Sequence, residues 1–279
     1  MERQKLTVTI HKDLFKQIDA IIDGEKIRNR SHATEYLITK GLGINKVRKA
    51  FILAGGKGTR LRPLTYELPK PMIPVHDRPL LEHIFELLIK HDIRDVIVSI
   101  GYKGNKIVDY FKDGKKYGLK ITYVKEKTPL GTAGPLKAAK KYLTEPFFLI
   151  WGDILADIDL TDFAHFHRET NAVATLALTS VSDPSPFGVV KMRGHNILDF
   201  IEKPLVGDEP SKLINAGYAL CNPEIITYIK KNRSMMESDI YPKLASNGLL
   251  AGYPFFGQWF DTGTYQTYEK VLKEWKGIS

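Results

Sequence analysis

Short apolar runs alternate with segments of helical spacing over most of the chain after residue 49. The runs predict buried strands, and apolar residues that recur every three or four positions predict amphipathic helices. Strands are expected at residues 51–53, 95–100, 121–124 and 147–151, with helices between them at 80–90, 107–111 and 136–142. Strands that alternate with helices are typical of a mostly parallel sheet covered by helices, so the pattern predicts an α/β fold.

Four more strands are expected in the next part of the chain, and they follow one another closely. They lie at residues 172–181, 188–191, 198–202 and 214–220. Strands joined by short connections pair antiparallel, because a parallel pair needs a long crossover. The pattern therefore predicts an antiparallel addition on one side of the sheet, which makes the sheet mixed.

The first 46 residues follow a different pattern. Residues 6–10 alternate strictly between apolar residues and threonine, which predicts a short half-buried strand. Apolar residues recur at helical spacing over 12–23, and a second helix is expected with Ser31 as its N-cap. One strand and two helices cannot enclose a core at this length. We therefore expect a small domain at 1–46 and a large one at 47–279.

Composition restricts the class of protein. The chain has 279 residues, of which 43% are hydrophobic, and this suits a globular protein with a core. No apolar run approaches the ~20 residues that span a bilayer, and no apolar signal segment opens the chain. The single Cys221 fits a buried apolar position in a reducing compartment, so we expect a cytoplasmic protein with no membrane partner. The net charge of +9, of which +3 lies in residues 1–46, fits polyanionic ligands.

A glycine-rich turn directly follows the expected strand at 51–53. Glycines leave no Cβ between the backbone amides and a guest, and cations near the same turn favour phosphate. The residues concerned are Gly55, Gly56 and Gly58, with Lys57, Arg60, Arg62 and Lys70. The spacing matches neither the Walker loop nor the dinucleotide fingerprint. The turn therefore predicts a polyphosphate site of another kind.

This stretch closely resembles the signature of the sugar-phosphate nucleotidylyltransferases. Leu-Ala-Gly-Gly-x-Gly-Thr-Arg-Leu, Pro-Leu-Thr and Pro-Lys-Pro-Met all stand between Leu53 and Met72. The resemblance covers 49–279 and implies a Rossmann-like nucleotidyltransferase fold. It implies that an NTP and a sugar-1-phosphate give an NDP-sugar and pyrophosphate, with Arg60 and Lys70 on the β and γ phosphates. It implies nucleotide binding by Leu53, Ala54, Gly55, Gly56, Gly58 and Thr59. Many relatives continue into a β-helix; because this chain ends at Ser279, none is expected.

Asp153 follows the expected strand at 147–151, after a glycine. Ligands gather at the carboxyl ends of strands in open α/β sheets, and a carboxylate there suits Mg²⁺, although an aspartate can also cap a turn. The resemblance implies that Asp153 is catalytic and binds Mg²⁺ together with Asp261 of Trp-x-Asp-x-Gly. The chain departs from the family afterwards, with Thr264-Tyr265 where Thr-Pro is frequent.

Two later segments resemble the sugar-binding part of the family. Glu202-Lys203-Pro204 closes an expected strand, and from the residues alone the pair reads as a solvated surface pair. The resemblance places Lys203 on the sugar phosphate as a catalytic residue and Glu202 on sugar hydroxyls. Asn215 and Gly217 resemble the sugar-contacting strand, where an amide can both donate and accept.

Residues 129–136 form a glycine turn that opens a helix, and they look most like mannose-1-phosphate guanylyltransferases. The resemblance places Gly131 and Thr132 against the nucleotide. Glu126 precedes the turn, and its carboxylate could accept the N1–H and N2–H₂ donors of guanine. Thr128 stands where a second acid is frequent, so the base stays open. GTP with mannose-1-phosphate is expected, and UTP or dTTP with glucose-1-phosphate is the alternative. A DNA-binding regulator that senses sugar nucleotides is the other class considered.

Residues 1–46 resemble ribbon-helix-helix repressors, in which two chains pair their strands and interlock their helices. The resemblance implies a homodimer and makes double-stranded DNA a possible partner. The candidate DNA-binding residues are Lys5, Thr7, Thr9, Arg28, Arg30 and Ser31. A dimerisation arm that touches no nucleic acid is the alternative. Elsewhere, His165 and His167 lie two apart on an expected helix and so point to different faces, which predicts no metal site there.

Overall fold

The structure is a computed structural model that describes residues 7–24, 27–42 and 46–279. Its contacts divide the chain into two compact units, Met1–Lys46 and Val47–Ser279, at the boundary expected from the sequence. The units are described separately below. Among the described residues, no helix is long and apolar enough to cross a membrane.

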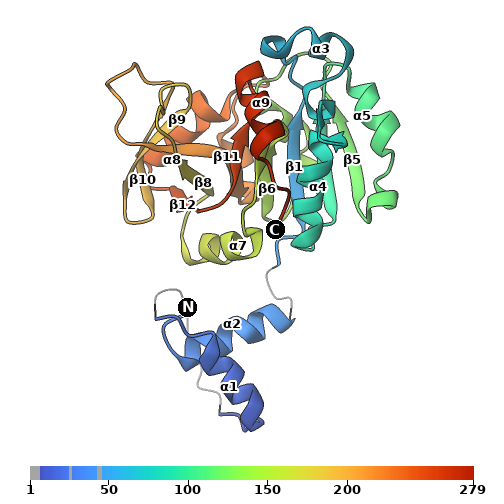
Figure 1. Cartoon of the computed structure of the whole chain (residues 1–279). Coiled ribbons are helices and arrows are strands. Elements are labelled where there is room, and N and C mark those ends of the chain that lie inside the picture. The colour runs from blue at the N-terminus through green and yellow to red at the C-terminus, as the bar shows by residue number, and fades with distance from the viewer. Residues whose placement is uncertain (1–6, 25–26, 43–45) are drawn as a thin grey trace. The chain divides into compact units, whose positions relative to one another are not determined.

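The larger unit is built on a nine-stranded sheet with β1 (Lys49–Ala54) near the middle of its parallel half (Figure 1). Parallel to β1 run β4 (Asp95–Ile100) on one side and β6 (Phe147–Trp151) on the other, and β5 (Lys120–Lys125) lies beyond β4. Leu53 is level with Ser99 and with Trp151. The carboxyl ends of these three strands therefore form one edge, where parallel sheets of this class bind ligands.

The other half of the sheet is mainly antiparallel. Its strands, in sheet order, are β11 (Leu213–Cys221), β8 (Ala174–Ser180), β12 (Leu250–Pro254), β10 (Asn196–Glu202) and β9 (Gly188–Arg193). Only β12 and β8 pair in parallel there, and β9 also meets β11 at a single position, Val189 opposite Ile214. The predicted mixed sheet is thus present, although antiparallel pairing takes a larger share than the sequence suggested. Two small ladders lie outside it: β2 (Pro74–Val75) with β3 (Arg78–Pro79), and β7 (Ile154–Ala156) with β13 (Trp259–Asp261).

Helices cover both faces of this sheet and bury two apolar clusters. Alternate residues of β1 enter different clusters: Ala50, Ile52 and Ala54 one, and Phe51 the other, as the two-residue period of a strand requires. The first cluster includes residues of α4 (Leu80–Lys90), α5 (Gly104–Phe111), α7 (Leu160–Glu169) and α9 (Tyr265–Glu274). The second includes residues of α6 (Gly134–Ala138) and α8 (Tyr241–Ser246). Because both faces of β1 are covered, the strand is apolar from Ala50 to Ala54, and its sequence therefore reads as an unbroken apolar run.

Short helical turns complete the unit. They are α3 (Leu64–Glu67), the 3₁₀ turns Thr59–Leu61, Lys70–Met72, Lys115–Tyr117, Lys140–Tyr142 and Pro223–Tyr228, and a π-helix at Met236–Ile240. The helix predicted at 80–90 has those bounds, whereas the one predicted at 136–142 is split between α6 and a 3₁₀ turn. The sequence analysis did not identify α8, β12 or α9.

The N-terminal unit contains α1 (Lys12–Ala20) and α2 (Arg30–Leu42). Both helices were predicted, but residues 7–10 of the expected strand are exposed and form no strand; its first residue lies outside the described part. A strand needs a neighbouring strand to pair its backbone groups, and no described residue of this unit provides one. The prediction that Ser31 caps the second helix is wrong: Asn29 Oδ1 accepts a hydrogen bond from the His32 amide at 3.0 Å, and Ser31 lies in the first turn.

Candidate active site

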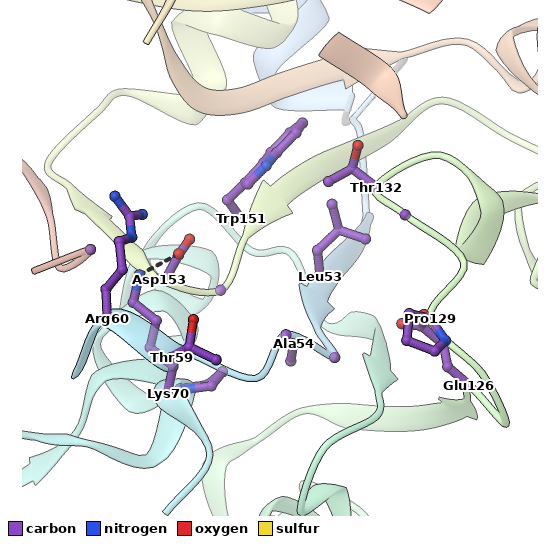
Figure 2. A pocket seen from close by; sticks show the side chains of 17 residues that line it. Leu53, Ala54, Thr59, Arg60, Lys70, Glu126, Pro129, Thr132, Trp151 and Asp153 are labelled. Carbon is purple, nitrogen blue, oxygen red and sulfur yellow. Dashed lines mark hydrogen bonds and ion pairs between the residues drawn. The ribbon is translucent and has the colours of Figure 1, made fainter. Parts of the chain in front are cut away.

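A cavity of about 410 Å³ opens at the edge where β1, β4 and β6 end (Figure 2). Its lining comes from the glycine-rich turn, the 3₁₀ turns that follow it, the turn before α6 and the end of β6. All nine residues predicted to bind the nucleotide line it: Leu53, Ala54, Gly55, Gly56, Gly58, Thr59, Glu126, Gly131 and Thr132. Arg60, Lys70 and Asp153 line it as well. The sequence therefore identified one contiguous surface, while the role of each residue stays a prediction.

The glycines of the turn are needed for different reasons. A Cβ on Gly55 would lie 2.4 Å from Glu126 Oε1, so the close approach of the Glu126 carboxylate excludes a side chain there. Gly58 has φ of +60°, and its Cβ would lie 2.9 Å from Thr65 Cγ2. Gly56, by contrast, has nothing within 4 Å of its Cβ position, and its backbone faces open space. Because Gly56 has no side chain and lines the cavity, it leaves space there for a ligand.

Two carboxylates and a lysine meet next to the cavity; Lys70 and Asp153 line it, and Asp261 lies behind this lining. Lys70 is buried, and its Nζ lies 2.5 Å from Asp153 Oδ2 and 4.0 Å from Asp261 Oδ1. Burial raises the pKa of Asp261 above its ordinary value, the nearby negative charge of Asp153 raises it further, and Lys70 and Arg60 lower it. Two carboxylates placed so close together attract a cation. Hard carboxylate oxygens that converge in this way fit Mg²⁺, so the residues present suit the predicted metal.

Thr262 holds these two carboxylates in register. It is buried, and both its backbone amide and its hydroxyl donate to the carbonyl oxygen of Asp153, at 3.1 and 2.7 Å. Asp261 ends β13, which pairs with β7 directly after Asp153. A late part of the chain is thereby fixed to the turn after β6, which explains how residues 108 positions apart come together.

The turn supplies fewer cations to the cavity than the sequence suggested. Arg60 and Lys70 line it, but Lys57 and Arg62 do not. The guanidinium of Arg62 lies 5.0 Å from the ring centroid of Tyr66, on the outside of the turn. The expectation that Lys57, Arg60 and Arg62 lie over the same spot is therefore wrong, because only Arg60 of the three lines the cavity.

Glu126 lies at the other end of the cavity and joins two elements. Its Oε1 accepts from the Ser99 hydroxyl at 2.8 Å, and its Oε2 accepts from the Leu130 amide at 3.2 Å. The carboxylate therefore fixes the turn before α6 to the end of β4. Each oxygen keeps a second lone pair, so the predicted contact with a nucleobase remains chemically feasible. Trp151 also lines the cavity and was missed in the sequence, although as the end of the predicted strand at 147–151 it lies level with Leu53.

The residues predicted for the sugar phosphate are not part of this lining. Lys203 Nζ lies 3.2 Å from Glu202 Oε1 with the lysine side chain mostly exposed. Asn215 Oδ1 accepts from the Gly217 amide at 3.1 Å. Gly217 has φ of +73°, and its Cβ would lie 2.2 Å from Ile154 Cδ1. The fold thus explains this glycine without a ligand.

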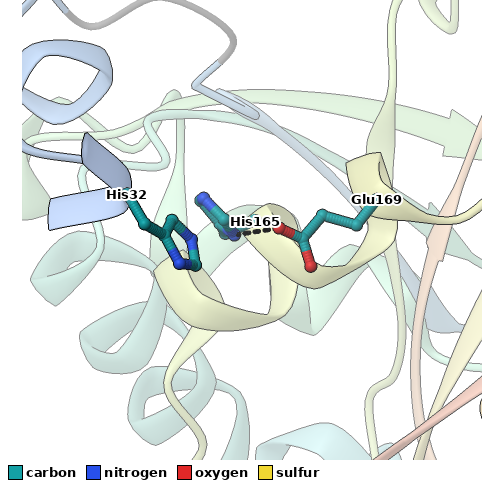
Figure 3. A group of neighbouring side chains, drawn as sticks. All are labelled: His32, His165 and Glu169. Atoms are coloured by element: carbon teal, nitrogen blue, oxygen red, sulfur yellow. Dashed lines mark ion pairs between the residues drawn. The ribbon is translucent and has the colours of Figure 1, made fainter. Parts of the chain in front are cut away.

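The two histidines on α7 have separate environments. His165 Nδ1 lies 3.7 Å from Glu169 Oε1, one helical turn later (Figure 3). His32, drawn in the same figure, belongs to the N-terminal unit and is not part of this pair. His167 is buried with Nδ1 2.6 Å from Thr175 Oγ1, and burial lowers its pKa. Cys221 is fully buried, as expected for a small apolar residue, and burial raises its pKa.

Comparison with known proteins identifies the class. A family model described as nucleotidyl transferase matches residues 49–276, and the chain therefore belongs to the nucleotidyl transferase family. The match confirms the predicted α/β nucleotidyltransferase fold of the larger unit.

The chain is also similar to individual curated proteins and to a solved structure. The chain is 38% identical over 223 residues to a mannose-1-phosphate guanyltransferase of Yarrowia lipolytica, covering 77% of this chain and 60% of the relative. It is 36% identical over 246 residues to a UTP–glucose-1-phosphate uridylyltransferase of Synechocystis sp., covering 81% and 62%. The solved structure of HddC from Yersinia pseudotuberculosis, complexed with GMP-PN, has a TM-score of 0.70 at 26% identity, covering 82% of this chain and 100% of that chain. The chain thus spans about three fifths of the length of these curated relatives.

Proposed function

We propose that this protein transfers a nucleotidyl group from an NTP to a sugar-1-phosphate, with GTP and mannose-1-phosphate as its substrates. The observation that carries the proposal is that a bare glycine backbone, Arg60, Lys70 and Asp153 line one and the same cavity. These are the groups that bind and neutralise a triphosphate. Membership of the nucleotidyl transferase family and the similarity to a mannose-1-phosphate guanyltransferase support it.

The reaction needs little covalent help from the protein. An oxygen of the sugar phosphate attacks the α-phosphorus in line, a P–O bond forms, and the bond from the α-phosphorus to the β-phosphate oxygen breaks as pyrophosphate leaves with the electron pair. The attacking phosphate is already anionic, so no strong base is required. Arg60 and Lys70 neutralise the charge that grows on pyrophosphate, and the glycine backbone positions the triphosphate.

Mg²⁺ fits this site through Asp153 and Asp261. When bound, it would supply positive charge to the phosphate oxygens beyond what the two cationic side chains provide. Thr262 keeps Asp153 in place for that role, because two of its donors hold the Asp153 carbonyl.

The choice of base and sugar rests on narrower support. The turn at 129–136 resembles the guanylyltransferases, Glu126 lines the cavity, and the solved structure of HddC is complexed with GMP-PN. UTP or dTTP with glucose-1-phosphate is the second candidate, favoured by the similarity to a uridylyltransferase. Lys203, Glu202, Asn215 and Gly217 remain the proposed sugar-phosphate residues on the strength of the family resemblance.

A screen for released pyrophosphate, with each NTP paired with each hexose-1-phosphate and Mg²⁺, tests this proposal. We expect the highest kcat/KM for GTP with mannose-1-phosphate. GTP as the poorest nucleotide would overturn the substrate assignment and leave the reaction class standing. No release from any pair would overturn the reaction class and favour a regulator that only senses sugar nucleotides.

We also propose that the N-terminal unit makes the protein a homodimer. The observation that favours this role is the apolar surface that the unit leaves exposed. Among the described residues of this unit, the exposed large apolar ones are Val8, Ile10, Leu14, Phe15, Leu37 and Ile38, and α1 contains no buried residue. A strand from a second copy would pair the backbone of residues 7–10 and cover this surface. Light scattering should report a smaller particle for Leu14→Glu/Phe15→Glu and an unchanged one for Gln17→Glu, an exposed position on the same helix.

Binding of double-stranded DNA by this unit is a further proposal with less support. Lys5 lies outside the described residues. Arg30 holds Asp19 through two hydrogen bonds of 2.6 and 2.9 Å and lies over the ring of Phe15, so its guanidinium already has partners. Thr7, Thr9 and Arg28 are exposed, and Ser31 lies in the first turn of α2. A salt-dependent gel shift that is lost in Arg28→Ala would support DNA binding, and no shift at low salt would leave dimerisation alone.

A further inference from the structure

Arg60 lines the cavity, and the backbone that carries it decides where its charge lies. Figure 2 shows Arg60 near Asp153 at one end of the cavity, away from Glu126. Among the described residues, none forms a hydrogen bond or an ion pair with the Arg60 guanidinium. A Cβ on Gly263 would lie 3.0 Å from Arg60 Nη2 and 2.6 Å from Asp261 Oδ2, so the guanidinium and this carboxylate approach the same glycine.

The turn that carries Arg60 is held from two sides. On one side, the Thr65 hydroxyl donates to the Gly58 carbonyl at 2.9 Å, within the same part of the chain. On the other side, the Tyr265 hydroxyl donates to the Leu61 carbonyl at 3.2 Å, from a position 204 residues later. Arg60 lies between these two carbonyls in the sequence, so both bonds fix the backbone that directs its side chain.

The Leu61 carbonyl needs a donor from elsewhere in the chain. Leu61 ends the 3₁₀ turn Thr59–Leu61, and the last carbonyls of a helical turn have no partner within it. Arg62 is already extended, with φ of −68° and ψ of 138°, so the turn does not continue. The Leu61 side chain is fully buried, which keeps this carbonyl close to the fold. Tyr265 therefore supplies a donor that the turn itself lacks.

Tyr265 is itself part of a well-anchored helix. It is the first residue of α9, and the preceding Thr264 forms a capping box with Thr267. Further along the helix, Val271 is fully buried. A capped helix with a buried face is a firm base for the hydroxyl group. Asp261 lies only four positions before Tyr265, so one short segment both carries this carboxylate and holds the turn of Arg60.

The contact depends on a position at which the chain departs from its family. Thr-Pro is frequent where this chain has Thr264-Tyr265, and proline has no hydroxyl that could donate. Proline is also favoured at the first position of a helix, because its backbone angle suits the helix and its missing N–H is not needed there. A tyrosine here gives up that backbone advantage, and the bond to Leu61 is what it adds.

We propose that Tyr265 is a positioning residue for Arg60, acting through the Leu61 carbonyl. Its hydroxyl ties the turn that carries Arg60 to the segment that carries Asp261, so the guanidinium and the carboxylate keep a fixed separation. The inference rests on the proposed function, because it assumes that Arg60 meets the phosphates of the NTP. Loss of the hydroxyl therefore acts on the NTP through Arg60 and has no effect where Arg60 is absent.

Steady-state kinetics with the substrate pair that the wild type turns over fastest tests this role. Tyr265→Phe removes the hydroxyl and keeps the ring. It is expected to lower kcat/KM for the NTP about fivefold, because one hydrogen bond that positions a charged group is lost. The KM for the sugar phosphate should change by less than about twofold. Equal changes for both substrates would indicate a general loosening of the site and overturn the inference.

A double-mutant cycle with Arg60→Ala separates a positioning role from a structural one. Because Tyr265 acts through Arg60, Arg60→Ala/Tyr265→Phe should have the kcat/KM of Arg60→Ala alone, about a hundredfold below the wild type. A further fivefold loss in the double variant would show that Tyr265 acts independently of Arg60. That result would overturn the inference.

The matched control is Tyr268→Phe. Tyr268 lies on the same helix, and its hydroxyl donates to the Pro74 carbonyl at 2.5 Å, so its loss frees α9 from a different part of the chain. Tyr268→Phe should keep kcat/KM within about twofold of the wild type. A loss as large as that of Tyr265→Phe would reduce Tyr265 to a support of the helix and overturn the inference.

Thermal unfolding checks that each variant is folded. If Tyr265→Phe does not fold, Tyr265→Pro tests the same bond, because proline suits the first helical position. Its kcat/KM for the NTP should fall at least fivefold, and an unchanged value would overturn the inference.

Failure of the inference is separable from failure of the proposed function. Wild-type turnover with an unchanged kcat/KM in Tyr265→Phe refutes the inference alone. If no pair of substrates is turned over, the reaction class fails, and calorimetry of GTP binding to the wild type, Tyr265→Phe and Tyr268→Phe still decides the inference. Weaker binding by Tyr265→Phe than by the other two supports it, and any other order, or no binding, overturns it.

Discussion

Two glycines that the family resemblance assigned to ligand binding, one inside the cavity lining and one outside it, are required for different reasons. Gly56 in the glycine-rich turn has nothing within 4 Å of its Cβ position. Gly217 on β11 has a left-handed φ of +73° and a Cβ position 2.2 Å from Ile154 Cδ1. The fold gives two reasons for a glycine at position 217, whereas no neighbouring atom of the structure excludes a side chain at position 56. A motif residue therefore indicates a ligand more strongly when the surrounding structure gives no other reason for it.

The largest effect on turnover is expected from a substitution of Asp153, where charged side chains are concentrated. Asp153→Asn keeps the shape of the side chain and removes its charge, so turnover should fall by several orders of magnitude while the melting temperature stays near that of the wild type. Pyrophosphate release and thermal unfolding measured on the same preparation check both parts. Undiminished turnover would remove Asp153 from the metal site.

Arg60 is expected to act on both binding and turnover. Arg60→Ala should raise the KM for the NTP and lower kcat, with a combined loss of about a hundredfold in kcat/KM, because the charge that develops on pyrophosphate loses a partner. Lys57→Ala is the matched control, since Lys57 belongs to the same turn but does not line the cavity. A change in KM alone for Arg60→Ala would mean that Arg60 only binds.

The pair of glycines itself gives a third prediction. Gly217→Ala should lower the free energy of unfolding by about 2 kcal/mol or more, since the left-handed φ and the contact with Ile154 both oppose a Cβ. Gly56→Ala should change stability by less than about 0.5 kcal/mol but weaken NTP binding about tenfold, because its methyl group would occupy the space that the phosphates need. Denaturant titration and nucleotide-binding calorimetry measure the two quantities. Equal destabilisation by both substitutions would contradict the comparison.

The smallest effect on catalysis is expected from removing residues 1–46. These residues form a unit of their own, and the residues that line the cavity all belong to Val47–Ser279. The shortened protein should keep kcat/KM within about threefold of the full chain and form a smaller particle in light scattering. A loss of activity that accompanies the loss of the dimer would show that the two units depend on each other.

Local patterns in the sequence predicted most of the parallel half of the sheet. A strand that is buried on both faces must be apolar throughout, so β1, β4 and β6 could be recognised without knowledge of their neighbours. The glycine-rich turn was equally informative, because its composition has few alternative explanations. Only the family resemblance predicted that Asp153 and Asp261 lie close together. No local pattern in the sequence shows that Thr262 donates a hydrogen bond to the Asp153 carbonyl.

Other parts of the structure could not be predicted because they depend on contacts between residues that the sequence alone does not show. The Arg62 guanidinium lies over the ring of Tyr66, and this contact directs its side chain. The helix α2 begins at Arg30, so Asn29 is its N-cap and Ser31 lies inside its first turn. The contact of Tyr265 could not be predicted for the same reason, because its partner Leu61 lies 204 positions away. A strand at 7–10 needs a second strand for its backbone, and the described part of its unit contains none.

The central claim is that the cavity at the ends of β1 and β6 transfers a nucleotidyl group. Mass spectrometry of the products formed from GTP, mannose-1-phosphate and Mg²⁺, by the wild type and by Asp153→Asn, tests it most directly. The wild type should give GDP-mannose and pyrophosphate in equal amounts, and Asp153→Asn should give almost none of either. GDP or GMP without a sugar nucleotide, or the same yield from Asp153→Asn, would contradict the claim.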